Sequence, residues 1–169
     1  MMRKETYERI FQVIGSNKES VMFWNVRGRA ITLCTGICYG VIILGRILLW
    51  QWRELGVLVL VPALSFFGVS VFRKLYDAKR PYEVYDFKPL LPKDTKGKSF
   101  PSRHVFSIFV IAVTVAHFYP EACISLGFAG IVLGVIRVIT GVHFPRDVIA
   151  GGALGIFFGI VANILFLFI

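Results

Sequence analysis

Residues 55–72 read LGVLVLVPALSFFGVSVF and contain no charged side chain, whereas the next nine residues, RKLYDAKRP (73–81), contain five. A run this long and apolar approaches the roughly 20 residues that an α-helix needs to cross a bilayer. Four more uncharged apolar runs occupy 30–45, 105–120, 122–136 and 148–169, and 56% of all residues are hydrophobic. We therefore expect an all-α protein, a polytopic membrane helical bundle of about five transmembrane helices.

The N-terminal segment, residues 1–29, differs from the apolar runs because it carries many charges. Within it, Tyr7, Ile10, Phe11 and Ile14 recur at helical spacing, which predicts a short amphipathic helix lying in the membrane interface, with a disordered tail as the alternative. No apolar stretch typical of a cleavable signal peptide is found there. We expect residues 1–169 to form a single membrane-embedded domain.

The charges of the chain are distributed unevenly if successive helices alternate in direction. Of the 19 Lys and Arg residues, 17 then lie on the side that carries the N-terminus, segment 73–104 and segment 137–147. The net charge of +9 does not indicate nucleic acid as a partner, because so little of the chain lies outside the apolar runs. Basic residues at membrane edges set topology or contact anionic headgroups.

Three polar clusters begin or end apolar runs on this same side. They are RKLYDAKRP (73–81), PSRH (101–104) and RVITGVHFPRD (137–147), and the connection at 74–100 is expected to form an irregular active-site loop. Snorkelling arginines and helix caps explain each cluster alone. They do not explain why two histidines and several arginines gather on one membrane face.

His143 and Asp147 lie four residues apart, a spacing that places both on one face of a helix. A carboxylate that accepts the imidazole N–H fixes the tautomer, so the other ring nitrogen can act as a nucleophile or base. A second histidine, His104, follows Ser102 and Arg103 at the start of another apolar run. Two histidines from different helices can provide the nucleophile and the proton donor of an in-line displacement at phosphorus.

The cationic residues around these histidines favour an anionic ligand. Guanidinium groups bind phosphate oxygens in a bidentate manner, and free N–H groups at a helix start also favour an anion. Only one carboxylate belongs to the cluster, so we expect no metal and no cofactor. The candidate phosphate-binding residues are Arg73, Arg80, Ser102, Arg103 and Arg137.

These motifs and their order resemble those of the type 2 phosphatidic acid phosphatase (PAP2) superfamily of membrane lipid phosphatases. The family pattern is Lys-x6-Arg-Pro, then Pro-Ser-Gly-His, then Ser-Arg-x5-His-x3-Asp. This chain keeps the spacings, but it has Arg73 in place of lysine, Arg103 in place of glycine and Ile136 in place of serine. Such family members usually have six spanning helices, and we expect the first of these to be replaced here by the amphipathic N-terminal segment.

The resemblance implies a role for each matching residue. His143 would be the nucleophile that forms a phosphohistidine, with Asp147 orienting it, and His104 would protonate the leaving oxygen and then activate water. The phosphoryl oxygens would be held by Arg73, Arg80, Ser102 and Arg137, to which we add Arg103 from its position alone. The remaining histidine, His117, lies near the other end of its apolar run and is expected to have an interfacial role.

The substrate implied by the resemblance is a lipid phosphate or diphosphate, such as undecaprenyl diphosphate, phosphatidic acid or phosphatidylglycerol phosphate. A lipid phosphotransferase of the same fold and a non-enzymatic anion-binding membrane protein are the alternatives. We expect a multi-pass protein of the cytoplasmic membrane. The positive-inside rule places the site in the cytoplasm, whereas many bacterial relatives act on the outer side, so its side stays open.

Glycines repeat every fourth residue in the last apolar run, at Gly151, Gly155 and Gly159. Such a repeat makes a smooth helix face that another helix can approach closely. We expect this face to pack within the monomer rather than against a second copy, and the sequence leaves the oligomeric state open.

Overall fold

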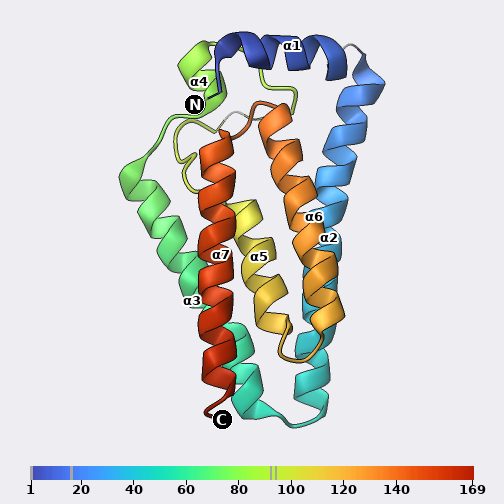
Figure 1. Cartoon of the computed structure of the whole chain (residues 1–169), viewed down its shortest axis with the longest axis vertical. Helices are drawn as coiled ribbons and strands as arrows, with labels where there is room; N and C mark the ends of the chain where they lie inside the picture. Colours follow the sequence, from blue (N-terminus) through green and yellow to red (C-terminus); the bar gives the residue numbers. More distant parts are fainter. Residues whose placement is uncertain (1, 16, 92, 94) are drawn as a thin grey trace.

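The computed structural model describes residues 2–15, 17–91, 93 and 95–169, and within these ranges it contains helices and no strand (Figure 1). The fold class predicted from the apolar runs, an all-helical bundle, is confirmed. The helices are α1 (Lys4–Ile14), α2 (Lys18–Leu48), α3 (Trp52–Tyr76), α4 (Pro81–Tyr85), α5 (Arg103–Val115), α6 (Pro120–Ile139) and α7 (Pro145–Phe166).

Four of the described helices, α2, α3, α6 and α7, are long and apolar enough to cross a membrane. The third expected span is shorter than its apolar run, because α5 has only 13 residues and ends at Val115. Residues 116–119 form a turn before Pro120, which starts α6. A residue before proline is disfavoured in the helical conformation, so the apolar run at 105–120 could not continue as one helix.

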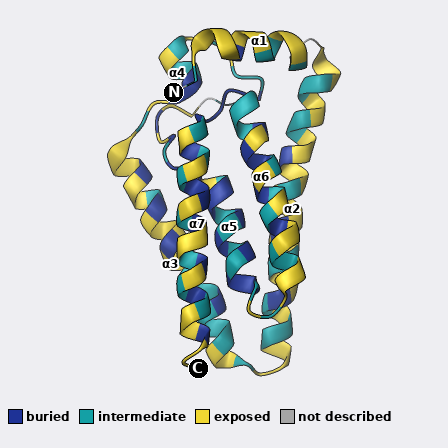
Figure 2. Ribbon diagram, in the orientation of Figure 1, coloured by how far each residue is buried: buried dark blue, intermediate teal, exposed yellow. Residues whose placement is uncertain are grey.

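Helix α5 lies at the centre of the bundle and contacts α2, α3, α6 and α7 (Figure 1). Its residues are largely buried, whereas the surrounding helices expose apolar side chains on their outer faces (Figure 2). Those exposed faces are the surfaces expected to meet lipid. The bundle therefore buries a short polar-ended helix behind four apolar ones.

The glycine repeat of α7 faces α5. A Cβ atom on Gly151 would lie 2.6 Å from the carbonyl oxygen of Ser102, and one on Gly155 would lie 2.7 Å from that of Phe106. The two backbones are thus close enough that only glycine fits between them. The expectation that this face packs within the monomer is confirmed.

The N-terminal segment divides into two helices. Helix α1 lies across one end of the bundle (Figure 1), where the fully buried Tyr7 packs against the rings of Tyr85, Phe87 and Phe144. Helix α2 begins at Lys18, well before the uncharged run, because the Asn17 side chain caps it by accepting a 2.7 Å hydrogen bond from the Ser20 amide. Only α1 therefore corresponds to the expected interfacial helix.

The connection between α3 and α5 is more ordered than an irregular loop, since α3 continues to Tyr76 and the short helix α4 follows. One Glu83 carboxylate oxygen accepts hydrogen bonds from the amides of Arg80 (2.9 Å) and Gly97 (2.8 Å), which ties the two ends of this connection together. The Leu90 amide donates to the Thr140 carbonyl at 3.1 Å. These contacts hold the described parts of the connection, residues 77–91 and 95–102, over the end of the bundle on which α1 lies.

Candidate active site

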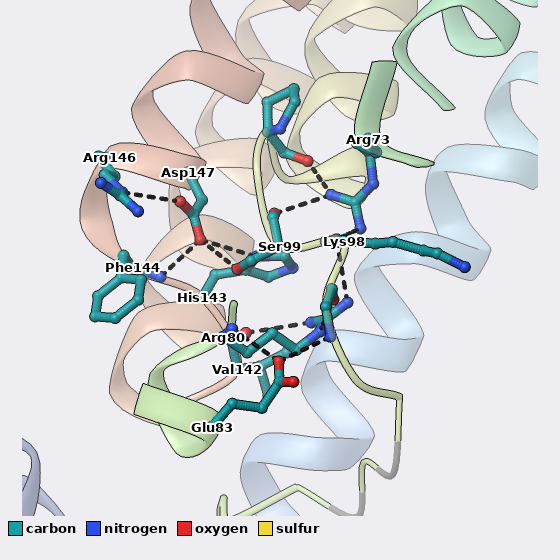
Figure 3. Close-up of polar contacts among 12 residues, drawn as sticks. Arg73, Arg80, Glu83, Lys98, Ser99, Val142, His143, Phe144, Arg146 and Asp147 are labelled. Atoms are coloured by element: carbon teal, nitrogen blue, oxygen red, sulfur yellow. Dashed lines mark hydrogen bonds and ion pairs between the residues drawn. The ribbon is translucent and has the colours of Figure 1, made fainter. Parts of the chain in front are cut away.

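His143 and Asp147 lie side by side (Figure 3), but only Asp147 belongs to α7, because this helix begins at Pro145. The expectation that both residues lie on one helix face is therefore wrong, and His143 stands in the loop before the helix. The Nδ1 atom of His143 is 3.5 Å from Oδ2 of Asp147, and the side chains are 3% and 0% exposed. The Ser99 hydroxyl donates a hydrogen bond to the same carboxylate oxygen and lies 3.3 Å from His143 Nδ1. Two buried side chains thus flank the Nδ1 atom of His143. Ser99 comes from the loop before α5, and Asp147 comes from α7.

Local sequence fixes the position of Asp147. Pro145 begins α7, and Asp147 stands at the third helical position, where its Oδ2 accepts a 3.0 Å hydrogen bond from the Phe144 amide. The Asp147 carbonyl in turn accepts a 2.8 Å hydrogen bond from the Ser102 amide. One residue therefore joins the start of α7 to the start of α5.

Burial determines the protonation state of His143. Desolvation lowers the pKa of the imidazole to about 4, although the hydrogen bond to Asp147 opposes this shift. The ring is therefore neutral at physiological pH. Because Nδ1 faces Asp147 and Ser99, Nε2 is the nitrogen left to react.

Arg73 and Arg80 lie on either side of the Ser99 segment, and both hold its backbone (Figure 3). Arg73 donates to the carbonyls of Ser99 (2.9 Å), Pro101 and Lys98. Arg80 donates to the carbonyls of Gly97 (3.0 Å), Val142 (3.2 Å) and Lys98 (3.5 Å). These contacts use part of the five N–H donors of each guanidinium, so both residues shape the loop as well as bringing positive charge to His143.

Ser102 and Arg137 carry unused hydrogen-bonding atoms. The Ser102 Oγ and the Arg137 Nε are buried without a hydrogen-bond partner among the described residues. Leaving such an atom unpaired costs on the order of 1–3 kcal/mol, which a ligand oxygen would offset. These two atoms, together with the arginines of the loop, fit an anion such as phosphate.

His104 and Arg103 stand at the start of α5, and both line a cavity of about 350 Å³ between α2, α3 and α5. His104 also lines an adjoining cavity of about 510 Å³ with Arg29 and Arg137. Arg103 is exposed, with its guanidinium 5.6 Å from the centre of the Phe66 ring. The structure thus places Arg103 on the cavity side of His104, away from the contacts that surround Asp147.

Two residues of this site were missed by the sequence reasoning. Ser99 lies two residues before the PSRH motif, and nothing in its spacing marks it as a partner of Asp147. The Tyr7 hydroxyl donates a 3.3 Å hydrogen bond to the His143 carbonyl across 136 positions of sequence. Burial and the nearby Asp147 charge raise the pKa of this phenol, which therefore stays protonated as a donor.

His117 lies at the opposite end of α5, where its ring stacks on Phe166 with 4.5 Å between centroids. This placement agrees with its exclusion from the site. Across the part of the chain that the structure describes, no group of three or more His, Cys, Asp or Glu side chains could hold a metal ion.

Comparison with known proteins identifies the family. The model of the PAP2 superfamily matches residues 54–168, which include every helix from α4 to α7 and all of the motifs above. The chain belongs to the PAP2 superfamily. With this membership and its four long apolar helices, it is a multi-pass membrane protein.

Several curated PAP2 relatives match part of the chain. A lipid A 1-phosphatase of Rhizobium johnstonii is 33% identical over 57% of this chain and 39% of its own length. An undecaprenyl-diphosphatase of Sulfolobus acidocaldarius is 31% identical over 61% of this chain and 51% of its own. The chain therefore spans about two fifths to one half of the length of these relatives.

Solved PAP2 structures share the fold. Aquifex aeolicus LpxE superimposes with a TM-score of 0.69 at 22% identity and covers 92% of this chain and 93% of its own. A PAP2-type phosphatidylglycerolphosphate phosphatase from Bacillus subtilis gives a TM-score of 0.51 at 21% identity, covering 100% of this chain and 98% of its own. At this identity the likeness concerns the fold.

Proposed function

We propose that this chain is a metal-independent phosphatase that hydrolyses a membrane lipid phosphate or diphosphate through a phosphohistidine intermediate. The observation that carries the proposal is the buried contact of His143 with Asp147 and Ser99, which engages Nδ1 and leaves a neutral imidazole with Nε2 free. PAP2 membership and relatives that are named as lipid phosphatases support the same reaction class.

In the first step, His143 Nε2 attacks phosphorus while the bond from phosphorus to the leaving oxygen breaks. Asp147 stabilises the positive charge that develops on the imidazole, and His104 donates a proton to the leaving oxygen. In the second step, His104 removes a proton from water, whose oxygen attacks the phosphohistidine and releases inorganic phosphate. Protons and electron pairs balance without a further reactant.

The phosphoryl oxygens would be bound by Arg73, Arg80, Ser102 and Arg137. The unpaired Ser102 Oγ and Arg137 Nε are the strongest candidates, because they have no competing partner among the described side chains and backbone. Arg73 and Arg80 would contribute their remaining N–H groups and their charge. The connection at 74–100 would form the active-site loop, and these two arginines hold the carbonyls of Gly97, Lys98 and Ser99 within it.

Lipid is the expected substrate because of where the cavities at His104 lie. The walls of the cavity of about 350 Å³ are formed by α2, α3 and α5, with Phe66, Ile108 and Ile111 beyond the polar end. A substrate with a phosphate at one end and an apolar chain at the other matches this distribution.

The test is phosphate release by the purified protein in detergent with EDTA present, using undecaprenyl diphosphate, phosphatidic acid and phosphatidylglycerol phosphate. His143→Ala is compared with His117→Ala, a matched control at the opposite end of α5. We expect release that persists in EDTA, survives in the control and disappears in His143→Ala. An acid-labile phosphoryl group on the wild type during turnover would support the intermediate.

Other outcomes separate the alternatives. Turnover that requires a lipid acceptor and yields little free phosphate would favour a phosphotransferase. Phosphate release that is unchanged in His143→Ala would refute the mechanism, and anion binding without any turnover would favour a binding protein.

A further inference from the structure

Two adjoining cavities meet at His104, and neither is lined by His143. The cavity of about 350 Å³ reaches Arg103, while the one of about 510 Å³ reaches Arg29 and Arg137. Both are also lined by Thr32 and Gly36 of α2. The cavities therefore lie on the face of His104 that looks toward α2, a helix segment outside the matched PAP2 region.

Arg29 and Arg103 bring charge to these cavities without a counter-charge. Neither guanidinium forms a hydrogen bond or an ion pair with any described residue; Arg103 only lies over the Phe66 ring. Arg29 is the last charged residue before the uncharged run of α2. Both side chains are exposed, so their guanidinium groups are open to a ligand in the cavities that they line.

The proposed mechanism determines which part of the substrate would occupy the two cavities at His104. In an in-line displacement the nucleophile and the leaving oxygen lie on opposite sides of phosphorus. If His143 attacks and His104 protonates the leaving oxygen, the group attached to that oxygen extends past His104 into the two cavities. In a lipid monophosphate this group is a carbon chain, whereas in a lipid diphosphate it is a second phosphate.

We infer that Arg29 and Arg103 form a binding site for this second phosphate, and that the substrate class is a lipid diphosphate. This inference rests on the proposed function. Methylene groups offer a guanidinium nothing to bind, whereas phosphate oxygens accept its hydrogen bonds, so each arginine that lines these cavities favours a phosphate there. The broken bond is then the one from the terminal phosphorus to the bridging oxygen, and the product is the lipid monophosphate.

The walls beyond the arginines suit the apolar part of such a substrate. A third cavity, of about 250 Å³, shares Phe66, Ser107 and Ile111 with the first and continues along Ile43 and Pro62. Charge at one end and apolar side chains at the other follow the order of groups in a lipid diphosphate.

The test compares farnesyl diphosphate with farnesyl monophosphate, which share one tail, in Arg29→Gln and Arg103→Gln. Arg27→Gln is the matched control, because Arg27 lies two residues away on α2, stacks 3.8 Å from the Phe23 ring and lines neither cavity. Removing a charge-assisted contact should lower kcat/KM for the diphosphate about 10- to 100-fold in each variant. The monophosphate value and the control should change less than about threefold.

The outcomes distinguish this inference from the proposed function. Equal losses on both substrates, or no loss on the diphosphate, would overturn the second-phosphate site while leaving a histidine phosphatase. Wild-type protein that releases phosphate from neither substrate, or His143→Ala that still releases it, would overturn the proposed function and this inference with it. Phosphatidylglycerol phosphate, whose second phosphate lies beyond a glycerol, serves as a third substrate, and an equal Arg29→Gln effect there would overturn the assignment to a diphosphate.

Discussion

Ser99→Ala removes the hydroxyl that joins Asp147 to His143 and leaves the rest of the site in place. The hydroxyl donates to Asp147 Oδ2 and lies 3.3 Å from His143 Nδ1, and Ser99 is fully buried. After the substitution, Asp147 Oδ2 keeps the 3.0 Å hydrogen bond from the Phe144 amide. The carboxylate therefore stays in position but loses one of the contacts that align the imidazole.

The expected loss of catalytic rate follows from the negative charge on the Asp147 carboxylate, which accepts the hydrogen bond from Ser99. A buried hydrogen bond to a charged group contributes about 1.5–3 kcal/mol, and each 1.36 kcal/mol corresponds to a tenfold change in rate. If Ser99 acts by positioning His143, kcat should fall about 10- to 100-fold, while KM should change little because the hydroxyl contacts no part of the proposed phosphate site.

The assay is phosphate release at varied lipid concentration, with the thermal midpoint of each variant measured in the same detergent. Thr140→Ala is the control, since Thr140 is also fully buried and its hydroxyl donates only to the Ile136 carbonyl of its own helix. A Ser99→Ala enzyme with kcat within twofold of wild type, or one that loses activity only through a raised KM, would refute the positioning role.

Three more predictions concern packing, protonation and sidedness. Gly155→Ala should lower the thermal midpoint through overpacking of about 1–3 kcal/mol against α5, whereas Gly127→Ala, where a Cβ atom would meet nothing within 4 Å, should not. Nitrogen NMR of labelled histidine should show His143 neutral from pH 7.5 to 5.5, because its pKa is lowered to about 4, and a midpoint near 6.5 would contradict this. Since the unfolded chain gains this proton first, the folded state should lose stability as the pH falls below about 6.5. The C-terminus lies at the end of the bundle opposite α1 (Figure 1), so a reporter fused there should map to the side of the membrane opposite the active site, and a label attached near α1 on the same side would refute the topology.

The sequence predicted those features that depend on local periodicity. Apolar runs located the long helices, and the spacing of His143 and Asp147 indicated that the two side chains meet, although His143 lies in the loop before α7 and not on the helix. The end of α5 at Val115 was hidden, because residues 116–119 contain no Lys, Arg, Asp or Glu that would interrupt the uncharged run. Ser99 and Tyr7 were missed for another reason: their partners lie 48 and 136 positions away, and only the packing of loops and α1 on the bundle brings them together.

Because α5 is short, we expect the turnover rate to depend on the thickness of the bilayer. With 13 residues at 1.5 Å each, α5 spans about 20 Å, whereas the hydrocarbon core is about 30 Å thick. The helices around it are longer, and the start of α5 lies deeper in the bundle than the ends of α6 and α7 on the side of α1 (Figure 1). If the ends of those long helices lie at the headgroup plane, a lipid phosphate must move below that plane to reach His104. Host lipids with shorter acyl chains reduce that displacement, so membrane composition would adjust turnover even where substrate and protein are unchanged.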